Sequence, residues 1–334
     1  MAERSESLKH WLTRILESDE FELKSVTADA SFRSYYRLYL NHPYKQAKTF
    51  IVMDAPPLQE DCAPFILITN ILLNSDINVP RIHDIDLEQG YLLLDDLGND
   101  LYLDKLNSDT ADKLYSDAIM ALVQMQTSAN VSELNDYNES LLRTEMNLFS
   151  EWLLSKHLNI VLDSDQTQAL ELLFNLLIEN VLQQPQCFVH RDFHSRNLMV
   201  TESRNPGVID YQDAVNGPAS YDLVSLLKDC YIKWPKEAIS HWLSLYLDKM
   251  AEAGFPLDHD QFQRWFDFMG VQRHLKASGI FARLSHRDGK HNYLNDVPLT
   301  LSYIVDLKNT YEELIPLCLL IEESVLPRFE ANDL

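Results

Sequence analysis

Four polar residues near the middle of the chain have the types and the spacing that phosphoryl transfer requires. His190, Asp192 and Asn197 lie in one loop that follows a short apolar run, and Asp210 follows a second short apolar run. Phosphoryl transfer needs a carboxylate that orients and deprotonates a hydroxyl group, and oxygen ligands that hold Mg²⁺ on the phosphates. Asp192, Asn197 and Asp210 can supply those groups, so the sequence predicts a phosphoryl-transfer site.

The order of these residues is more specific than their types. An H-x-D-x-x-x-x-N pattern followed by I-D is the arrangement that the kinase-like fold uses. In the alternative, Asp192 and Asn197 cap a loop and Asp210 forms a turn at the end of a strand, as Asp and Asn often do. The agreement of all parts in one order favours the catalytic interpretation.

The composition excludes several classes of partner. The chain has 334 residues, which is more than one hydrophobic core normally spans, so two domains are expected. Its 28 Lys and Arg residues stand against 51 Asp and Glu residues, which gives a formal net charge of −23. Because such a surface repels nucleic acids and anionic lipids, we expect neither as a partner, and no protein partner is evident.

The cysteines and the N-terminus indicate a compartment. The four cysteines form no C-x-x-C pair, which argues against a zinc knuckle or a disulfide framework and fits a reducing environment. The first residues lack the basic start and apolar run of a signal peptide, and no apolar run is long enough to span a bilayer. We therefore expect a cytoplasmic protein.

The first hundred residues and the rest of the chain have different textures. After an opening amphipathic helix, the first part has strand signals at 21–28, 35–40 and 49–55, a polar link at 41–48, a helix at about 61–74 and a hairpin at 78–97 that turns at Gln89-Gly90. Helical periodicity then dominates, at 108–127, 138–157, 163–182 and from about 219 onward. The sequence predicts an α+β protein with a small strand-rich lobe containing one helix and a larger, mostly helical lobe.

The chain resembles the aminoglycoside phosphotransferase family, on the pattern HRDFHSRN followed by IDYQD and GPASYDLVSLL. The resemblance covers nearly the whole chain and implies a bilobal, protein-kinase-like fold with ATP as co-substrate and Mg²⁺ as cofactor. The small antiparallel β-sheet lobe would be residues 1–97, with a connecting segment at 94–98, and the helical lobe residues 98–334.

The resemblance also implies roles for individual residues. Asp192 would be the catalytic base, Asn197 and Asp210 the metal ligands, and Asp222 a structural aspartate that braces the catalytic loop. His190 would orient that loop rather than act as a base. Within the family, segments such as SFRSYYRLYL and FIVMDAPP are similar to the cell-wall sugar kinases that phosphorylate the anomeric hydroxyl of N-acetylmuramate and N-acetylglucosamine in peptidoglycan recycling.

The strand-rich lobe departs from the usual kinase pattern at the phosphates. The third strand has no lysine at 51–54, the following helix has no glutamate at its middle, and the loop at 28–36 has no glycine. We hypothesise that Arg33, with Arg37 as second choice, supplies the missing positive charge to a phosphate. In the alternative, Arg33 is solvated and Arg37 points outward from a strand. Ser31 in the same loop, and Leu94 and Asp96 in the connecting segment, are further nucleotide-binding candidates.

The catalytic loop is locally basic in an acidic protein. His194, Arg196, Asp213 and Arg273 are candidates for substrate binding, and aromatic residues around Tyr231 could stack on a sugar ring. In the alternative, Arg191 and Arg196 pair with Asp213 or Asp222. Lys276 is interpreted as part of a solvated helix face, and the alternative for Arg273 is a salt bridge at the edge of the core. The basic loop favours a neutral or carboxylate-bearing sugar over a polycationic aminoglycoside.

Three functions are therefore open from the sequence. The first is an ATP-dependent sugar 1-kinase of N-acetylmuramate and N-acetylglucosamine. The second is a kinase of another alcohol, such as an aminoglycoside or a choline-like substrate. The third is a nucleotide-binding module without catalysis, which the missing lysine and glycines would permit but for which Asp192, Asn197 and Asp210 would have no use.

Overall fold

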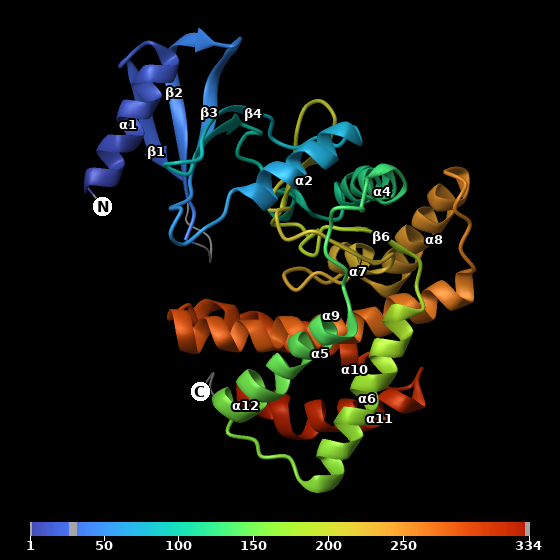
Figure 1. Cartoon of the computed structure of the whole chain (residues 1–334). Helices are drawn as coiled ribbons and strands as arrows, with labels where there is room; N and C mark the ends of the chain where they lie inside the picture. The colour runs from blue at the N-terminus through green and yellow to red at the C-terminus, as the bar shows by residue number, and fades with distance from the viewer. Residues whose placement is uncertain (1, 27–31, 331–334) are drawn as a thin grey trace. The chain divides into compact units, whose positions relative to one another are not determined.

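A computed structural model describes residues 2–26 and 32–330, in which the chain forms two compact units. The first unit contains Met1–Leu101 and Leu198–Asp213, and the second contains Tyr102–Asn197 and Ala214–Leu334. Figure 1 shows the course of the chain by colour. Leu198–Asp213, which follows the loop at 190–197, belongs to the strand-rich unit. The sequence prediction instead divides the chain once, at 97/98.

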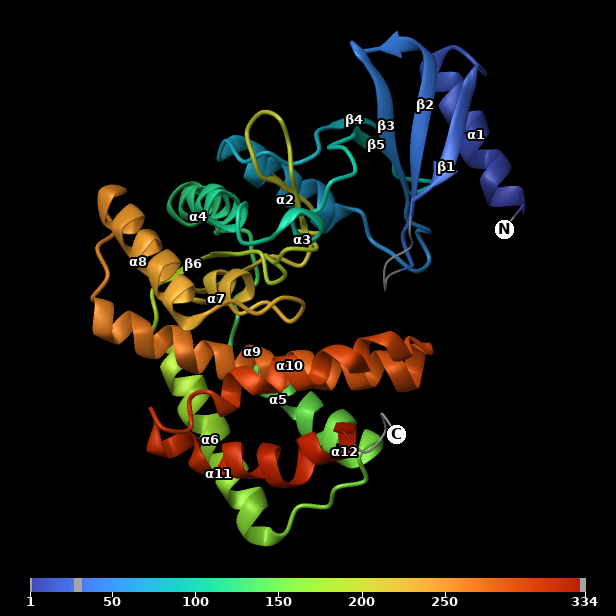
Figure 2. The ribbon, with the colours of Figure 1, turned by 180° about the vertical axis from the view of Figure 1, so that it is seen from behind.

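The first unit is built on a five-stranded antiparallel sheet with the order β1-β2-β3-β5-β4 (Figure 2). Its strands are β1 (Phe21–Ser25), β2 (Ser34–Tyr44), β3 (Ala47–Asp54), β4 (Ile82–Asp86) and β5 (Tyr91–Asp95). The predicted polar link at 41–48 is wrong, because β2 and β3 run through most of it. Only Lys45 and Gln46 form the turn, and both have positive φ, as a two-residue hairpin loop requires.

A helix packs on this sheet through its apolar face. Trp11 and Leu12 of α1 (Ala2–Leu16) lie in one buried cluster with Leu38, Phe50 and Tyr91 of the sheet. The amphipathic helix predicted at the N-terminus is therefore confirmed. The unit is completed by α2 (Ala63–Asn74) and by the short hairpin of β7 (Leu198–Met199) and β8 (Gly207–Val208).

The second unit is mostly helical, as predicted. Its first half contains α3 (Tyr102–Lys105), α4 (Ala111–Ser128), α5 (Glu139–Leu148), the π-helix η1 (Phe149–His157), α6 (Ser164–Leu182), β6 (Gln186–Val189), β9 (Val215–Pro218) and α7 (Tyr221–Leu227). Its second half contains α8 (Lys236–Glu252), α9 (His259–Asp288), η2 (His291–Asp296), α10 (Val297–Val305), η3 (Glu312–Leu314), α11 (Ile315–Leu320), η4 (Ile321–Val325) and α12 (Leu326–Glu330). In the described part of the chain, no helix has the length and apolar character needed to cross a membrane.

The long helix α9 lies at the centre of the second unit (Figure 1), and both apolar and polar side chains of it are buried there. A Cβ atom at Gly279 would come within 2.3 Å of the backbone of Leu148, so glycine allows α9 to pack closely on the end of α5. This packing brings the polar residues of α9 to the loop that follows β6. That loop starts where β6 pairs with β9, at Val189 opposite Val215.

Candidate active site

One carboxylate holds the first half of the loop at 190–197, which is the loop predicted to be catalytic. Asp222, in the first turn of α7, accepts hydrogen bonds from the backbone N–H groups of His190, at 2.6 Å, and Arg191, at 3.0 Å. Burial raises the pKa of this fully buried carboxyl group to about 7. Arg191 has φ +77°, a conformation that is uncommon for a residue with a side chain, and the two bonds hold it there. Asp222 therefore fixes the backbone at the start of this loop.

Hydrogen bonds within the loop fix the backbone of Asp192. The backbone N–H of Asp192 donates to Nδ1 of His190 at 3.2 Å. The carbonyl oxygen of Asp192 accepts from Nδ2 of Asn197 at 3.0 Å and from the backbone N–H of His194 at 3.0 Å. Asn197 in turn donates its own backbone N–H to the carbonyl oxygen of His194, at 2.9 Å. The ring of His190 is fully buried and serves the backbone of the loop, so the geometry gives it a positioning contact.

The charges around Asp192 keep its side chain ionised. Burial alone would raise the pKa of this carboxyl group, but Lys276, His194 and Arg273 outweigh burial and hold the pKa below its usual range. Because burial lowers the pKa of His194 itself, Lys276 and Arg273 are the groups that stay charged at neutral pH. A carboxylate at this position can accept a hydrogen bond from a hydroxyl group and then take its proton.

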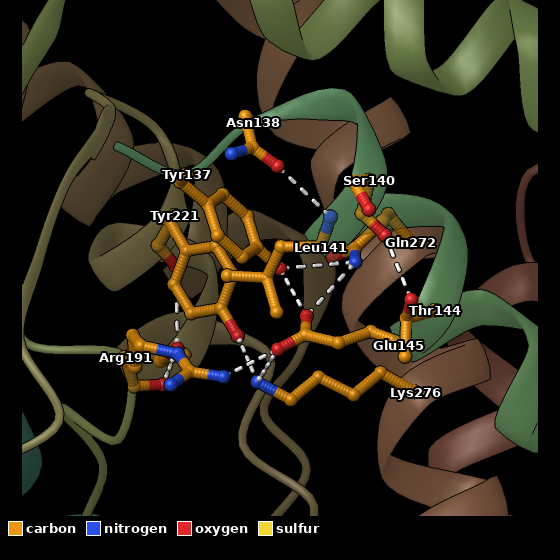
Figure 3. A network of polar contacts seen from close by, with 11 residues as sticks. Tyr137, Asn138, Ser140, Leu141, Thr144, Glu145, Arg191, Tyr221, Gln272 and Lys276 are labelled. Atoms are coloured by element: carbon orange, nitrogen blue, oxygen red, sulfur yellow. Dashed lines mark hydrogen bonds and ion pairs between the residues drawn. The ribbon is translucent and has the colours of Figure 1, made fainter. Parts of the chain in front are cut away.

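Arg191 belongs to a buried polar network with residues of α5 and α9 (Figure 3). The carboxylate of Glu145 forms ion pairs with Arg191 and with Lys276, whose Nζ lies 3.1 Å from Oε1. The same carboxylate accepts from the hydroxyl of Tyr137 and from Nε2 of Gln272, the latter at 3.3 Å. The prediction that Lys276 belongs to a solvated helix face is wrong, because α9 is covered on that side and the ammonium group is buried against Glu145.

The second half of the loop is held by a residue that the sequence prediction missed. Oδ2 of Asp229 accepts from the backbone N–H of Ser195, at 3.0 Å, and from its hydroxyl group. The other oxygen of Asp229 accepts from the backbone N–H of Tyr231 at 3.2 Å. Asp222 in the first turn of α7 and Asp229 just after its end therefore hold the two halves of the loop. No motif or periodicity in the sequence indicated this role of Asp229, because the residue lies in an irregular segment after α7.

Two of the predicted substrate-binding residues, His194 and Arg196, contact the ring of Tyr231. The ring of His194 packs edge-on against Tyr231 at 5.5 Å, and the guanidinium carbon of Arg196 lies 3.5 Å from the centre of the same ring. Nη1 of Arg273, on α9, lies 3.7 Å from the sulfur of Cys230.

The side chain of Arg191 does not pair with either of the two aspartates that the sequence suggested as alternatives. Its guanidinium group pairs with Glu145, so the alternative in which this group pairs with Asp213 or Asp222 is wrong. Asp222 binds the backbone of Arg191 instead. Asp213, the remaining substrate candidate, is exposed.

In the first unit, α2 packs against the residue that follows Asp210. The ring of Tyr211 stacks on Phe65 at 5.1 Å, and its hydroxyl forms a 2.9 Å hydrogen bond with that of Thr69. Asp210 itself has φ +63° and accepts from Nε2 of Gln212 at 3.0 Å. An aromatic stack thus occupies the part of α2 where the sequence lacks the usual glutamate.

Two ion pairs lie in the part of the first unit where the lysine is missing. Asp54 at the end of β3 accepts from Nε of Arg4 at 2.8 Å. Nη2 of Arg33 lies 3.2 Å from Oε2 of Glu60, and Arg33 is largely buried, so the alternative in which it is solvated is wrong. Ser31 lies outside the described residues.

Arg37 binds the segment that follows β5. Its Nε lies 2.9 Å from Oδ2 of Asp96, and its Nη2 donates to the carbonyl oxygen of Gly98 at 2.6 Å. It also donates to the side chain of Asn99. Arg37 therefore does not simply point outward, and it fixes the segment in which Leu94 and Asp96 are the nucleotide-binding candidates. Leu94 is buried in β5.

The donors available for a metal ion suit a nucleotide-bound Mg²⁺. Within residues 2–26 and 32–330, no group of three or more His, Cys, Asp or Glu side chains is placed to hold a metal ion. Mg²⁺ on a nucleotide takes most of its ligands from phosphates and water and needs only one or two from the protein. The amide of Asn197 and the carboxylate of Asp210 are of the right chemical type for that small share.

Comparisons with known proteins agree with this chemistry. Residues 22–255 match a family described as "Phosphotransferase enzyme family". An N-acetylmuramate/N-acetylglucosamine kinase of Pseudomonas putida is 44% identical over 303 residues, which are 90% of this chain and 88% of that protein. A protein of the same name from Neisseria meningitidis is 40% identical over 329 residues, which are 97% of this chain and 96% of that one.

A solved structure confirms the fold class. The ADP-bound aminoglycoside phosphotransferase APH(2'')-Ib is similar with a TM-score of 0.57 and 15% sequence identity, over 89% of this chain and 97% of that one. At this identity the likeness concerns the fold, which is the protein-kinase-like arrangement of an antiparallel sheet followed by a larger helical part.

Proposed function

Since the chain belongs to the phosphotransferase enzyme family, we propose that it is an ATP-dependent kinase of N-acetylmuramate and N-acetylglucosamine. The observation that carries this proposal is the 40–44% identity to kinases named for those two sugars, which extends over most of both chains. The phosphorylated group would be the anomeric hydroxyl, and the reaction would serve the recycling of cell-wall sugars. Because ATP is the co-substrate, we place the reaction in the cytoplasm.

Asp192 is the proposed base of the reaction. Its carboxylate accepts the proton of the anomeric hydroxyl while that oxygen attacks the γ-phosphorus of ATP. The new bond joins the sugar oxygen to phosphorus, the bond between phosphorus and the bridging oxygen of ADP breaks, and ADP leaves. The support for this role is the fixed backbone of Asp192 in the loop and the cationic surroundings that keep its carboxylate ionised.

Asn197 and Asp210 are the proposed ligands of Mg²⁺. The ion would neutralise the charge of the phosphates during transfer. The chain holds both donors in place. The carbonyl oxygen of Asp192 accepts a hydrogen bond from the amide of Asn197. Tyr211 anchors the segment that contains Asp210 by stacking on Phe65 of α2.

The nucleotide-binding residues remain proposals. We assign Arg33 to a phosphate, because a largely buried guanidinium at the end of the loop replaces the missing lysine with the same sign of charge. Ser31 belongs to that loop, and Leu94 and Asp96 to the segment for adenine, with Arg37 supporting it. The candidates for the sugar are the four named from the sequence: His194, Arg196, Asp213 and Arg273.

Product analysis tests this function. The protein is incubated with ATP, Mg²⁺ and either sugar, and the product is analysed by ³¹P NMR and mass spectrometry. We expect the sugar 1-phosphate from both sugars. The matched control is the methyl glycoside of N-acetylglucosamine, whose anomeric oxygen is blocked and which should not react.

The outcomes separate the alternatives. Phosphorylation of the methyl glycoside would move the reaction to another hydroxyl. Turnover of an aminoglycoside or of choline, with neither cell-wall sugar reacting, would assign the chain to another alcohol substrate. Binding of ATP without turnover on any alcohol would leave a nucleotide-binding module.

A further inference from the structure

Arg273 is a buried cation that forms no ion pair with any carboxylate in the described part of the chain. It lies on α9, and only 5% of the residue is exposed. Its contact is a weak one, in which Nη1 lies 3.7 Å from the sulfur of Cys230. Burial raises the pKa of Cys230, so this thiol is neutral and offers no charge.

Two other buried cations in the same unit show the difference. Lys276 lies 3.1 Å from Glu145, and Lys228 lies 2.7 Å from Asp267. A buried guanidinium without an anionic partner costs several kcal/mol, and a folded protein normally avoids that cost by pairing. Asp192 and Asp229 act on the charge of Arg273 only from beyond ion-pair distance, so its guanidinium lacks the close carboxylate contact that Lys276 and Lys228 have, and an anion from outside the chain can supply that contact.

The surroundings of Arg273 place this anion close to the proposed base. Arg273 is near enough to lower the pKa of the Asp192 carboxyl group. Cys230 is followed by Tyr231, against which His194 packs. The Nδ1 atom of His194 is buried and has no hydrogen-bond partner among the described residues. An unpaired cation and an unpaired ring nitrogen thus accompany the carboxylate that would accept the hydroxyl proton.

We propose that Arg273 binds the carboxylate of the acceptor sugar and thereby distinguishes N-acetylmuramate, which has a lactyl carboxylate, from neutral N-acetylglucosamine. This inference rests on the proposed function. A guanidinium presents parallel N–H donors that match both oxygens of a carboxylate, and the pairing adds affinity only for the acidic sugar. The neutral sugar is held without this contact.

Two variants test the inference from the protein side. Arg273→Gln removes the charge, and we expect KM for N-acetylmuramate to rise about 10- to 100-fold, with KM for N-acetylglucosamine changed less than about threefold. Because Arg273 also lowers the pKa of Asp192, its loss should lower kcat by the same factor for both sugars. Arg273→Lys keeps the charge but not the planar fork, and we expect it to regain part of the loss. The matched control is Arg264→Gln on the same helix, where a surface arginine pairs with Glu313 at 2.9 Å and both sugars should be unaffected.

The carboxamide of N-acetylmuramate tests the same contact from the substrate side. The KM of the wild-type protein should be higher for the carboxamide than for N-acetylmuramate by the same factor by which Arg273→Gln raises KM for N-acetylmuramate. The two changes combined should raise KM no more than either alone. An unchanged KM for N-acetylglucosamine shows that the variant is folded, since that reaction uses the same base and nucleotide.

The results that would overturn the inference are specific. An equal rise in KM for both sugars would assign Arg273 to the phosphoryl group or to the fold, and unchanged KM for N-acetylmuramate would exclude a substrate contact. If the wild-type protein phosphorylates neither sugar, the proposed function itself fails, and the inference fails with it.

Discussion

The ammonium group of Lys276 lies 3.1 Å from Oε1 of Glu145, and both side chains are buried. Arg191, which directly precedes Asp192, pairs with the same carboxylate. One carboxylate on α5 thus joins α9 to the loop that carries the proposed base. Because two cations share one anion in a place without bulk water, the removal of Glu145 leaves both of them uncompensated.

The first prediction concerns stability. We expect Glu145→Gln to lower the free energy of unfolding at pH 7 by about 3–5 kcal/mol, since it breaks a buried ion pair and leaves its partners charged. Urea unfolding followed by circular dichroism measures the change. Glu139→Gln, at an exposed position on the same helix, is the control and should have little effect.

The same carboxylate gives stability a pH dependence. Burial alone would raise the pKa of Glu145, but Lys276 and Arg191 hold it below its usual range. The unfolded chain therefore binds more protons as pH falls through about 4.3, so the contribution of Glu145 is present above that pH and is lost below it. Glu145→Gln should show a shallower fall in unfolding free energy as pH decreases below about 5. Parallel curves for the two proteins would contradict this assignment.

A second prediction concerns the base. We expect Asp192→Asn to lower kcat by about 10²- to 10⁴-fold, because proton transfer to the side chain is lost. ATP affinity measured by calorimetry should be unchanged, because the backbone carbonyl of residue 192 still accepts from Asn197. Asp165→Asn, at an exposed aspartate of α6, is the control. A variant that keeps wild-type kcat would remove Asp192 from the chemical step.

The sequence could name the loop at 190–197 because that information is local, and its catalytic role stays a prediction. The spacing of His190, Asp192 and Asn197 lies within one loop, and Asp222, named from the resemblance, accepts from its backbone. Strand and helix periodicity predicted most elements of both units. The turn at Lys45-Gln46 was hidden because polar residues such as His42 lie on strands with an exposed face.

The partners of the loop could not be predicted, because they come from distant parts of the chain. Charge patterns place Lys276 and Glu145 on helices, but they do not say that α9 is covered by α5 at that position. A polar residue on a helix is predicted to be solvent-exposed only if the helix buries one face alone. Helix α9 is buried on several sides, so this prediction fails there. The same reason hid the contact of Tyr211 with α2.

A third prediction concerns the missing lysine. We expect Arg33→Ala to raise the KM for ATP about tenfold, since a charge-assisted contact to a phosphate is lost. Steady-state kinetics at saturating sugar measure the effect. Arg14→Ala is the control, because Arg14 is a surface residue of the same unit that pairs with Asp86 at 3.4 Å. Unchanged KM and kcat in Arg33→Ala would exclude this residue from phosphate binding.

The last prediction concerns the support of Asp210. Because the hydroxyl of Thr69 donates to the carbonyl oxygen of Phe65 at 2.7 Å, the hydroxyl of Tyr211 is the donor in its bond to Thr69, and its ring stacks on Phe65. Tyr211→Leu removes both contacts and loosens the segment that holds the proposed metal ligand. We expect the Mg²⁺ concentration for half-maximal activity to rise about 10-fold or more, as for other residues that orient a metal ligand.

Tyr211→Phe separates the two contacts. It keeps the stack and loses only the hydrogen bond, and Thr69 remains satisfied by Phe65, so the Mg²⁺ requirement should change less than about threefold. Titration of activity with Mg²⁺ at fixed ATP, beside thermal unfolding of each variant, makes the comparison. If Tyr211→Leu lowers the melting temperature while its Mg²⁺ titration matches that of the wild type, the aromatic stack stabilises the unit without orienting Asp210.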